Sequence, residues 1–115
     1  MRKFRSHLLG VAQGSELLFS DFEHDGEMWT GSGPREFRLA VKFPESYARP
    51  PVVHVSISMW DMDAGFNQRA DISAENIGRD GFDIVFRTWQ DSRVARIRAD
   101  WTALGEVDDD EAWEL

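Results

Sequence analysis

The sequence of 115 residues contains no cysteine. Disulfide bonds, thiolate metal sites and a cysteine nucleophile are therefore excluded. No apolar run approaches the roughly 20 residues needed to cross a bilayer, so we expect no membrane insertion. Basic residues are also scarce, with 13 against 21 acidic ones and a formal net charge of −8. Because nucleic acids bind to positively charged surfaces, this balance argues against a nucleic-acid partner.

Signals for secretion and for catalysis are missing as well. The basic start, residues 1–5, is not followed by the long apolar core and small-residue cleavage site of a secretory signal. The expected location is therefore open: cytoplasmic by default, or outside the cell as part of a larger exported assembly.

The sequence has no nucleophile elbow, no phosphate-binding glycine loop and no Ser/His/Asp order that spacing singles out. We expect neither enzymatic activity nor a cofactor.

Metal binding is also weakly supported. The three histidines, His7, His24 and His54, do not have the spacing of a metal site. Four acidic residues, Asp21, Glu23, Asp25 and Glu27, could offer oxygens to calcium. They lack the full pattern of Asp/Asn, glycine and distal glutamate that a dedicated calcium loop has, so a solvated loop is the favoured interpretation and no metal site is predicted.

The pattern of apolar residues predicts strands and no helix. Apolar and polar residues alternate through segments 35–43, 52–60 and 69–77, and a shorter apolar patch at 8–11 is a further candidate strand. A second patch at residues 17–19 is separated from the first by Gln13-Gly14-Ser15 and is followed by an expected loop, 20–27, and an exposed turn, 30–33. Five or six short strands with turns between them predict an antiparallel sandwich or barrel. We expect one domain, with residues 1–34 as its first strand and loops, 35–105 as its core and 106–115 as an acidic tail.

Residues 81–101 carry the clearest pattern in the chain. Phe82, Ile84 and Phe86 alternate with polar or smaller residues, and a second alternating arm follows the polar break at 90–92. The stretch therefore predicts a β-hairpin in which each arm buries one apolar face. The same alternation places Trp89 away from the core, where an indole can serve as a contact surface.

A set of residues suited to sugar recognition lies around Trp89. Sugars present apolar C–H faces that stack on aromatic rings, while their hydroxyl pairs bind planar groups such as guanidinium and amide. Arg69 and Asn67 at the end of a polar loop, together with the turn at 30–33, offer such groups. The alternative is structural: Arg69 pairs with an acidic neighbour and Trp89 covers an edge of the fold.

Several short pieces of the sequence follow one another in a recognisable order. They are Arg49-Pro50-Pro51-Val52-Val53, Ser56-Ile57-Ser58, Asp61, Asn67-Gln68-Arg69, Gly81-Phe82, Thr88-Trp89 and Asp100-Trp101. In this order, across about residues 35–104, they resemble the H-type lectin domain, the family that includes the snail agglutinin and the C-terminal domain of the slime-mould discoidins. The combined pattern is specific, although no single piece of it is.

The resemblance implies a six-stranded antiparallel β-sandwich that assembles as a trimer. It also implies binding of galactose or N-acetylgalactosamine in a shallow site between neighbouring subunits. The family's sugar-binding arginine and asparagine correspond to Arg69 and Asn67, its aromatic residue to Trp89, and the polar residue after it to Gln90. Two positions depart from the family: Ser32 stands near the place of the sugar-binding aspartate, and Gln90 replaces the histidine of the snail protein.

Two functions are compatible with these observations. The first is a non-enzymatic lectin that binds glycans of the galactose or N-acetylgalactosamine type as a trimer, single or stacked, for example in adhesion. The second is a structural trimeric module of a phage-like or surface assembly that has lost or altered sugar binding. The missing carboxylate at Ser32 and the missing secretion signal motivate the second function.

Overall fold

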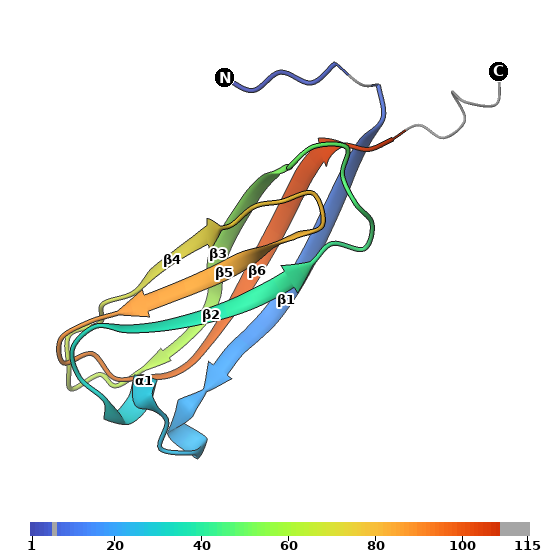
Figure 1. Ribbon diagram of the computed structural model, residues 1–115. Coiled ribbons are helices and arrows are strands. Elements are labelled where there is room, and N and C mark those ends of the chain that lie inside the picture. Colours follow the sequence, from blue (N-terminus) through green and yellow to red (C-terminus); the bar gives the residue numbers. More distant parts are fainter. Residues whose placement is uncertain (6, 109–115) are drawn as a thin grey trace.

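The computed structural model describes residues 1–5 and 7–108, and in these residues the chain forms two packed sheets (Figure 1). The strands are β1 (Leu9–Ser20), β2 (Arg35–Lys42), β3 (Val52–Met62), β4 (Asp71–Glu75), β5 (Gly81–Thr88) and β6 (Val94–Glu106). Two short helical segments, η1 (Asp21–Glu23) and α1 (Glu27–Thr30), connect β1 to β2. The strand orders are β1-β6-β3 and β2-β5-β4, and every pair is antiparallel. The predicted six-stranded antiparallel sandwich is confirmed.

The strand β6 ends at Glu106, where the acidic tail was expected to begin, and residues 109–115 of that tail lie outside the described residues. Among the described residues, no helix is long and apolar enough to cross a membrane.

The core lies between the two sheets and is built from the faces that alternation predicted. Ile84 and Phe86 of β5 and Ile97 and Ala99 of β6 are all fully buried. Aromatic rings join the two layers: the rings of Phe82 and Trp101 have centroids 5.4 Å apart at an interplanar angle of 70°. Such edge contacts add to the free energy gained by burying apolar surface.

The predicted β-hairpin at residues 81–101 is wrong. The two arms, β5 and β6, belong to different sheets: β5 pairs with β2 and β4, whereas β6 pairs with β1 and β3. Residues 89–93 thus carry the chain from one sheet to the other. Alternation predicts which side chains are buried but not which strand supplies the hydrogen bonds, and a short polar connection is compatible with either arrangement.

The first strand also differs from the sequence prediction. Instead of an apolar patch interrupted at residues 13–15 and a loop from residue 20, β1 runs without a break to Ser20, and η1 and α1 follow. Gly14 lies opposite Trp101, and a Cβ atom at Gly14 would come within 2.4 Å of the indole Nε1. This glycine therefore makes room for the indole within a strand, and it does not end the strand.

An irregularity in β3 reverses the predicted faces at its end. The pairing with β6 shifts register between Ile57 and Met59, so Met59 lies opposite the exposed Arg98. Alternation predicted that Met59 and Ile57 lie on the same, core-facing side of the strand. In the structure Met59 lies on the opposite side. The next residue, Trp60, lies opposite the buried Ile97, although 61% of Trp60 is exposed. A bulge of this kind shifts every following side chain to the other face.

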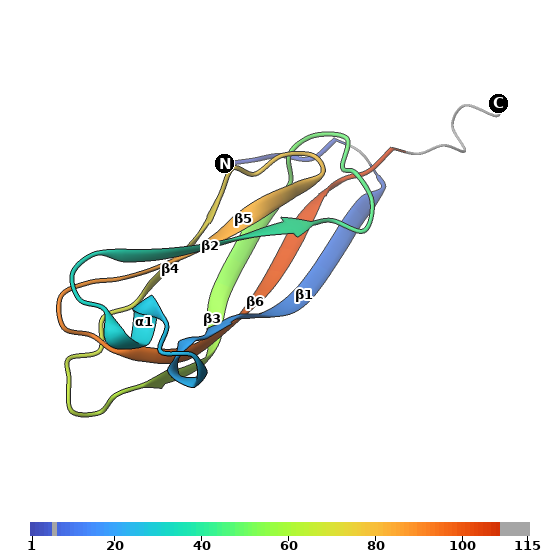
Figure 2. The ribbon, with the colours of Figure 1, turned by 60° about the horizontal axis from the view of Figure 1, so that its bottom comes forward.

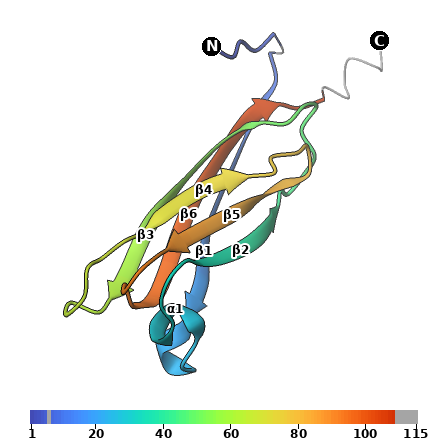
Figure 3. The ribbon, with the colours of Figure 1, turned by 60° about the vertical axis from the view of Figure 1, so that its left-hand side comes forward.

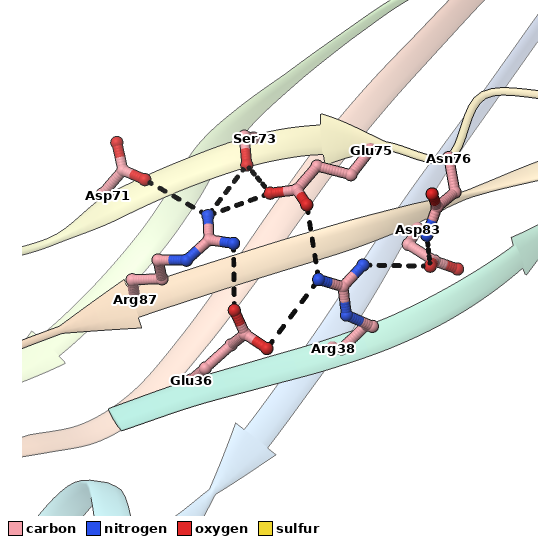
Figure 4. A network of polar contacts seen from close by, with 8 residues as sticks. All are labelled: Glu36, Arg38, Asp71, Ser73, Glu75, Asn76, Asp83 and Arg87. Atoms are coloured by element: carbon pink, nitrogen blue, oxygen red, sulfur yellow. Dashed lines mark hydrogen bonds and ion pairs between the residues drawn. The ribbon is translucent and has the colours of Figure 1, made fainter. Parts of the chain in front are cut away.

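A network of charged and polar side chains covers the outer face of the β2-β5-β4 sheet (Figure 4). Its members are Glu36, Arg38, Asp71, Ser73, Glu75, Asn76, Asp83 and Arg87. Arg87 contacts carboxylate oxygens of Glu36 and Glu75 at 2.9 Å each, and Arg38 contacts Asp83 at 3.1 Å. Val85, in the middle of this outer face, is fully buried. The aliphatic stems of long charged side chains can cover apolar surface in this way.

Because of this outer-face network, the stability of the fold is expected to decrease as the pH falls into the acid range. The hydrogen bond from Arg87, followed by that from Ser73, lowers the pKa of Glu75, while the hydrogen bonds from Asn76 and Arg38 lower the pKa of Asp83. A carboxyl group with a lowered pKa in the folded state stabilises the fold above its ordinary pKa. That stabilisation is lost as the pH falls through the folded-state value.

We expect the Glu75→Gln substitution to remove part of this pH dependence. At pH 7 the variant should be less stable than the wild type, and the difference should shrink below the ordinary glutamate pKa of 4.5. Urea unfolding at several pH values measures it, with Glu45→Gln, at an exposed position outside the network, as control. A difference that stays constant down to acid pH would contradict this assignment.

Candidate functional site

Three connections meet at the end of the sandwich away from the two termini, and we call this end the tip (Figures 2 and 3). They are residues 21–34, 63–70 and 89–93. Backbone hydrogen bonds join them: the N–H of Gly33 donates to the carbonyl of Gln90 at 2.9 Å, and the N–H of Asp63 donates to the carbonyl of Arg93 at 3.0 Å. The tip therefore brings together segments that are distant in the sequence.

The turn at Gln90 is fixed by its backbone. Gln90 has a φ of +56°, in the left-handed region, and its carbonyl also accepts a hydrogen bond from Nη2 of Arg35 at 3.1 Å. The partner turn contains Gly33, with a φ of +75°, directly after the exposed Ser32. Two residues predicted for the site, Ser32 and Gln90, are thus brought together.

Arg35 is a buried organiser of the tip that the sequence analysis did not single out. The residue is only 4% exposed. Its guanidinium donates to the carbonyls of Gly33 at 3.0 Å, Met28 at 3.1 Å and Gln90 at 3.1 Å. Burial lowers the pKa of Arg35, and the nearby Glu27 acts in the opposite direction. The sequence could have indicated that Arg35 is buried, because Arg35 has the same position in the two-residue alternation as the core-facing residues of β2.

Ser92 holds the second half of the candidate site, and its role was also missed. Its side chain is fully buried and donates to the carbonyl of Asn67 at 2.5 Å, while it accepts the N–H of Arg69 at 3.0 Å. Thr88, also buried, donates to the carbonyl of Arg69 at 2.6 Å. The segment 67–69 is therefore held through its backbone by Thr88 and Ser92.

Arg69 and Asp91 form an ion pair at this position. Nη1 of Arg69 lies 2.5 Å from Oδ1 of Asp91, and the side chains are 21% and 54% exposed. The sequence analysis offered a structural alternative in which Arg69 pairs with an acidic neighbour. This ion pair is present in the structure. The side chain of the exposed Asn67 makes no hydrogen bond to any described residue. The pair and this amide present donors and acceptors together to solvent.

Trp89 lies on the other side of the turn. It is 40% exposed, as predicted, and lines a groove of about 280 Å³. The other lining residues are Pro34, Arg35, Glu36, Arg87 and Thr88. The polar wall of the groove is the Glu36–Arg87 ion pair of the outer-face network, visible in Figure 4. Arg69 does not line this groove, so the predicted residues form two groups on either side of the 89–93 connection.

A set of cation–π contacts joins the connections of the tip. The guanidinium of Arg93 lies 4.3 Å from the ring centroid of Trp29 and 5.5 Å from that of Phe66. It also donates to the carbonyl of Trp29 at 2.9 Å and pairs with Asp63 at 3.3 Å. These contacts link all three connections and stabilise their relative positions.

Asp21, the first acidic residue of the segment 21–27, has a structural role. Oδ2 of Asp21 accepts the N–H of Met28 at 3.0 Å, within the first turn of α1. Among the described residues, no three histidine, aspartate or glutamate side chains are grouped so that they could hold a metal ion.

Comparison with known proteins identifies the class. The sequence profile of the H-type lectin domain matches residues 38–104. The chain belongs to this family of lectin-like carbohydrate-binding domains, and the resemblance noted in the sequence is confirmed.

The chain is similar to proteins of two organisms. A protein of Fuscovulum blasticum named ATP synthase subunits region ORF 7 is 62% identical over 107 residues, which cover 93% of each chain. Discoidin-1 of Dictyostelium discoideum is 40% identical over 75 residues, which are 64% of this chain and 30% of that protein. The solved structure of discoidin II from the same organism superimposes with a TM-score of 0.76 at 25% identity, covering 95% of this chain and 41% of that one. The chain thus spans less than half of the discoidins that it matches.

Proposed function

We propose that this protein is a non-enzymatic lectin that binds glycans of the galactose or N-acetylgalactosamine type at the tip. The observation that carries the proposal is the partly exposed Arg69–Asp91 pair, held in place by the buried Ser92. A preorganised pair needs little ordering on binding, which reduces the entropic cost of recognising a small ligand.

Arg69, Asp91 and Asn67 bind the sugar hydroxyls in this proposal. The guanidinium donates, the carboxylate accepts, and the amide does both. Asp91 also compensates for Ser32, because it supplies a carboxylate to a site whose family aspartate is missing. Charge-assisted hydrogen bonds contribute about 1.5–3 kcal/mol each, so one carboxylate changes affinity substantially.

In this proposal, Trp89 of a neighbouring copy packs on the apolar C–H face or the acetamido group of the sugar, because Trp89 and Arg69 of one chain lie in separate groups. Its indole is exposed beside the groove at Pro34, and aromatic surface of this kind suits a ligand with one apolar face. Ser32 and Gln90 lie at the turn between Trp89 and Arg69 and complete the rim with neutral polar groups.

We further propose that three copies assemble, with each site lying near a boundary between copies. Support for association comes from the outer face of the β1-β6-β3 sheet, which carries exposed apolar residues at the end opposite the tip, and the position of the site near a boundary is carried over from the family resemblance. Val11, Leu104 and Val52 lie side by side across its three strands, and Val11 and Val52 are 63% and 45% exposed. An apolar row on a sheet face favours association. Three weak sites presented together gain avidity for a multivalent glycan surface, which suits a role in adhesion.

Sedimentation and calorimetric titration test the proposal together. We expect the purified protein to sediment as a trimer and to bind galactose or N-acetylgalactosamine with one site per chain. A trimer that binds neither sugar would favour the alternative, a structural adhesion or spike module, and a monomer would contradict the assembly.

A further inference from the structure

Trp60 is an exposed indole on the core-facing side of β3. It is 61% exposed, the largest exposed fraction of any aromatic side chain in the described core strands, although it lies opposite the fully buried Ile97. The register shift after Ile57 places it there, beyond the edge of the packed core. A bulge that directs a large apolar side chain into solvent is a feature often found beside functional sites.

A groove lies beside this indole, where the edge strands β3 and β4 of the two sheets run next to each other (Figure 3). It has a volume of about 280 Å³ and is lined by Ile57, Trp60, Met62, Gln68 and Ala70. Gln68 and Ala70 belong to the segment directly before β4, which begins at Asp71.

The chemistry of the groove is neutral. None of its lining residues is charged, and Gln68 supplies the amide group. The nearest charged residue along β3, Asp61, is already paired with Arg96 at 3.0 Å. An exposed indole with an amide and no charge suits a ligand that offers an apolar face and neutral hydroxyls, whereas an ionic ligand would find no counter-charge.

The groove and the proposed sugar site share one short segment of the chain. Gln68, in the groove, stands between Asn67 and Arg69, whose backbone atoms are held by Ser92. A ligand longer than one sugar that occupies the Arg69–Asp91 site would follow this segment to reach Trp60.

We propose that the Trp60 groove is a second subsite, which binds the next sugar residues of a glycan whose terminal galactose-type residue lies at Arg69 and Asp91. This inference rests on the proposed lectin function and specifies its ligand: a neutral oligosaccharide rather than a single sugar. The indole of Trp60 stacks on a pyranose ring, and the amide of Gln68 binds one of its hydroxyls.

The test compares Trp60→Ala and Trp60→Phe with the wild type, using galactose and lacto-N-neotetraose, a galactose-terminated tetrasaccharide. The wild type should bind the tetrasaccharide about tenfold more tightly than galactose, a difference that corresponds to about 1.4 kcal/mol. Trp60→Ala should lose most of this gain and keep the galactose affinity, and Trp60→Phe should retain part of it. Phe22→Ala removes another exposed aromatic side chain, 42% exposed, and should change neither affinity.

The possible outcomes separate the two proposals. If the wild type binds galactose but Trp60→Ala leaves the tetrasaccharide affinity unchanged, the subsite is wrong and the lectin function stands. If Trp60→Ala changes the sedimenting mass, Trp60 belongs to a contact between copies and the subsite is likewise overturned. If the wild type binds neither sugar, both proposals fail together.

Discussion

Replacing Arg69 with alanine is expected to weaken binding of galactose-type sugars about 100-fold. Two charge-assisted hydrogen bonds of about 1.5 kcal/mol each account for a loss of this size. The fold should survive, because the contacts that hold segment 67–69 in place use the backbone N–H and carbonyl of Arg69. Calorimetric titration of folded Arg69→Ala with galactose and N-acetylgalactosamine measures the effect.

The matched control is Arg49→Ala. Arg49 is exposed in the connection between β2 and β3, at the other end of the sandwich. The substitution removes one positive charge without touching the tip, so sugar affinity should not change. Equal losses in the two variants would show that binding depends on net charge and would contradict the assigned site.

The second large effect is on stability, from replacing Arg35 with alanine. We expect the free energy of unfolding to fall by about 3 kcal/mol, because the change leaves the partly or fully buried carbonyl acceptors of Gly33, Met28 and Gln90 without their charged donor. Urea unfolding measures the difference. Since two of these carbonyls belong to the turns at the tip, sugar affinity should fall as well.

Arg79→Ala provides the comparison for this effect. Arg79 also donates to a backbone carbonyl, that of Tyr47 at 2.8 Å, but it makes one such bond at the opposite end of the fold. We expect a loss of about 1 kcal/mol and no change in sugar binding. If Arg35→Ala were no more destabilising than Arg79→Ala, the central role given to Arg35 would be wrong.

The fold was predictable from the sequence up to the choice of strand partners. Alternation placed Phe82, Ile84 and Phe86 correctly in the core, because burial follows from the two-residue period. It could not reveal that β5 and β6 lie in different sheets, since both arrangements bury the same faces. The bulge after Ile57 was equally hidden, because a one-residue shift in pairing leaves no trace in composition.

The residues proposed to contact the ligand could be chosen from the sequence, whereas the residues that support them could not. Arg69, Asn67 and Trp89 were identified by their chemistry and by their order along the chain. The burial of Ser92 depends on how the 67–69 segment packs against the 89–93 connection, which local sequence does not determine. The role of Asp91 follows from the same packing, since spacing alone identified an acidic partner for Arg69 only in general terms.

A glycan-array screen of the purified protein, with Arg69→Ala beside it, tests the central claim most directly. The account predicts that the wild type binds glycans ending in galactose or N-acetylgalactosamine and that the variant, equally folded, does not. Binding of other glycans that the variant also loses would keep the site and change its specificity. No binding to any glycan by a folded trimer would contradict the lectin function.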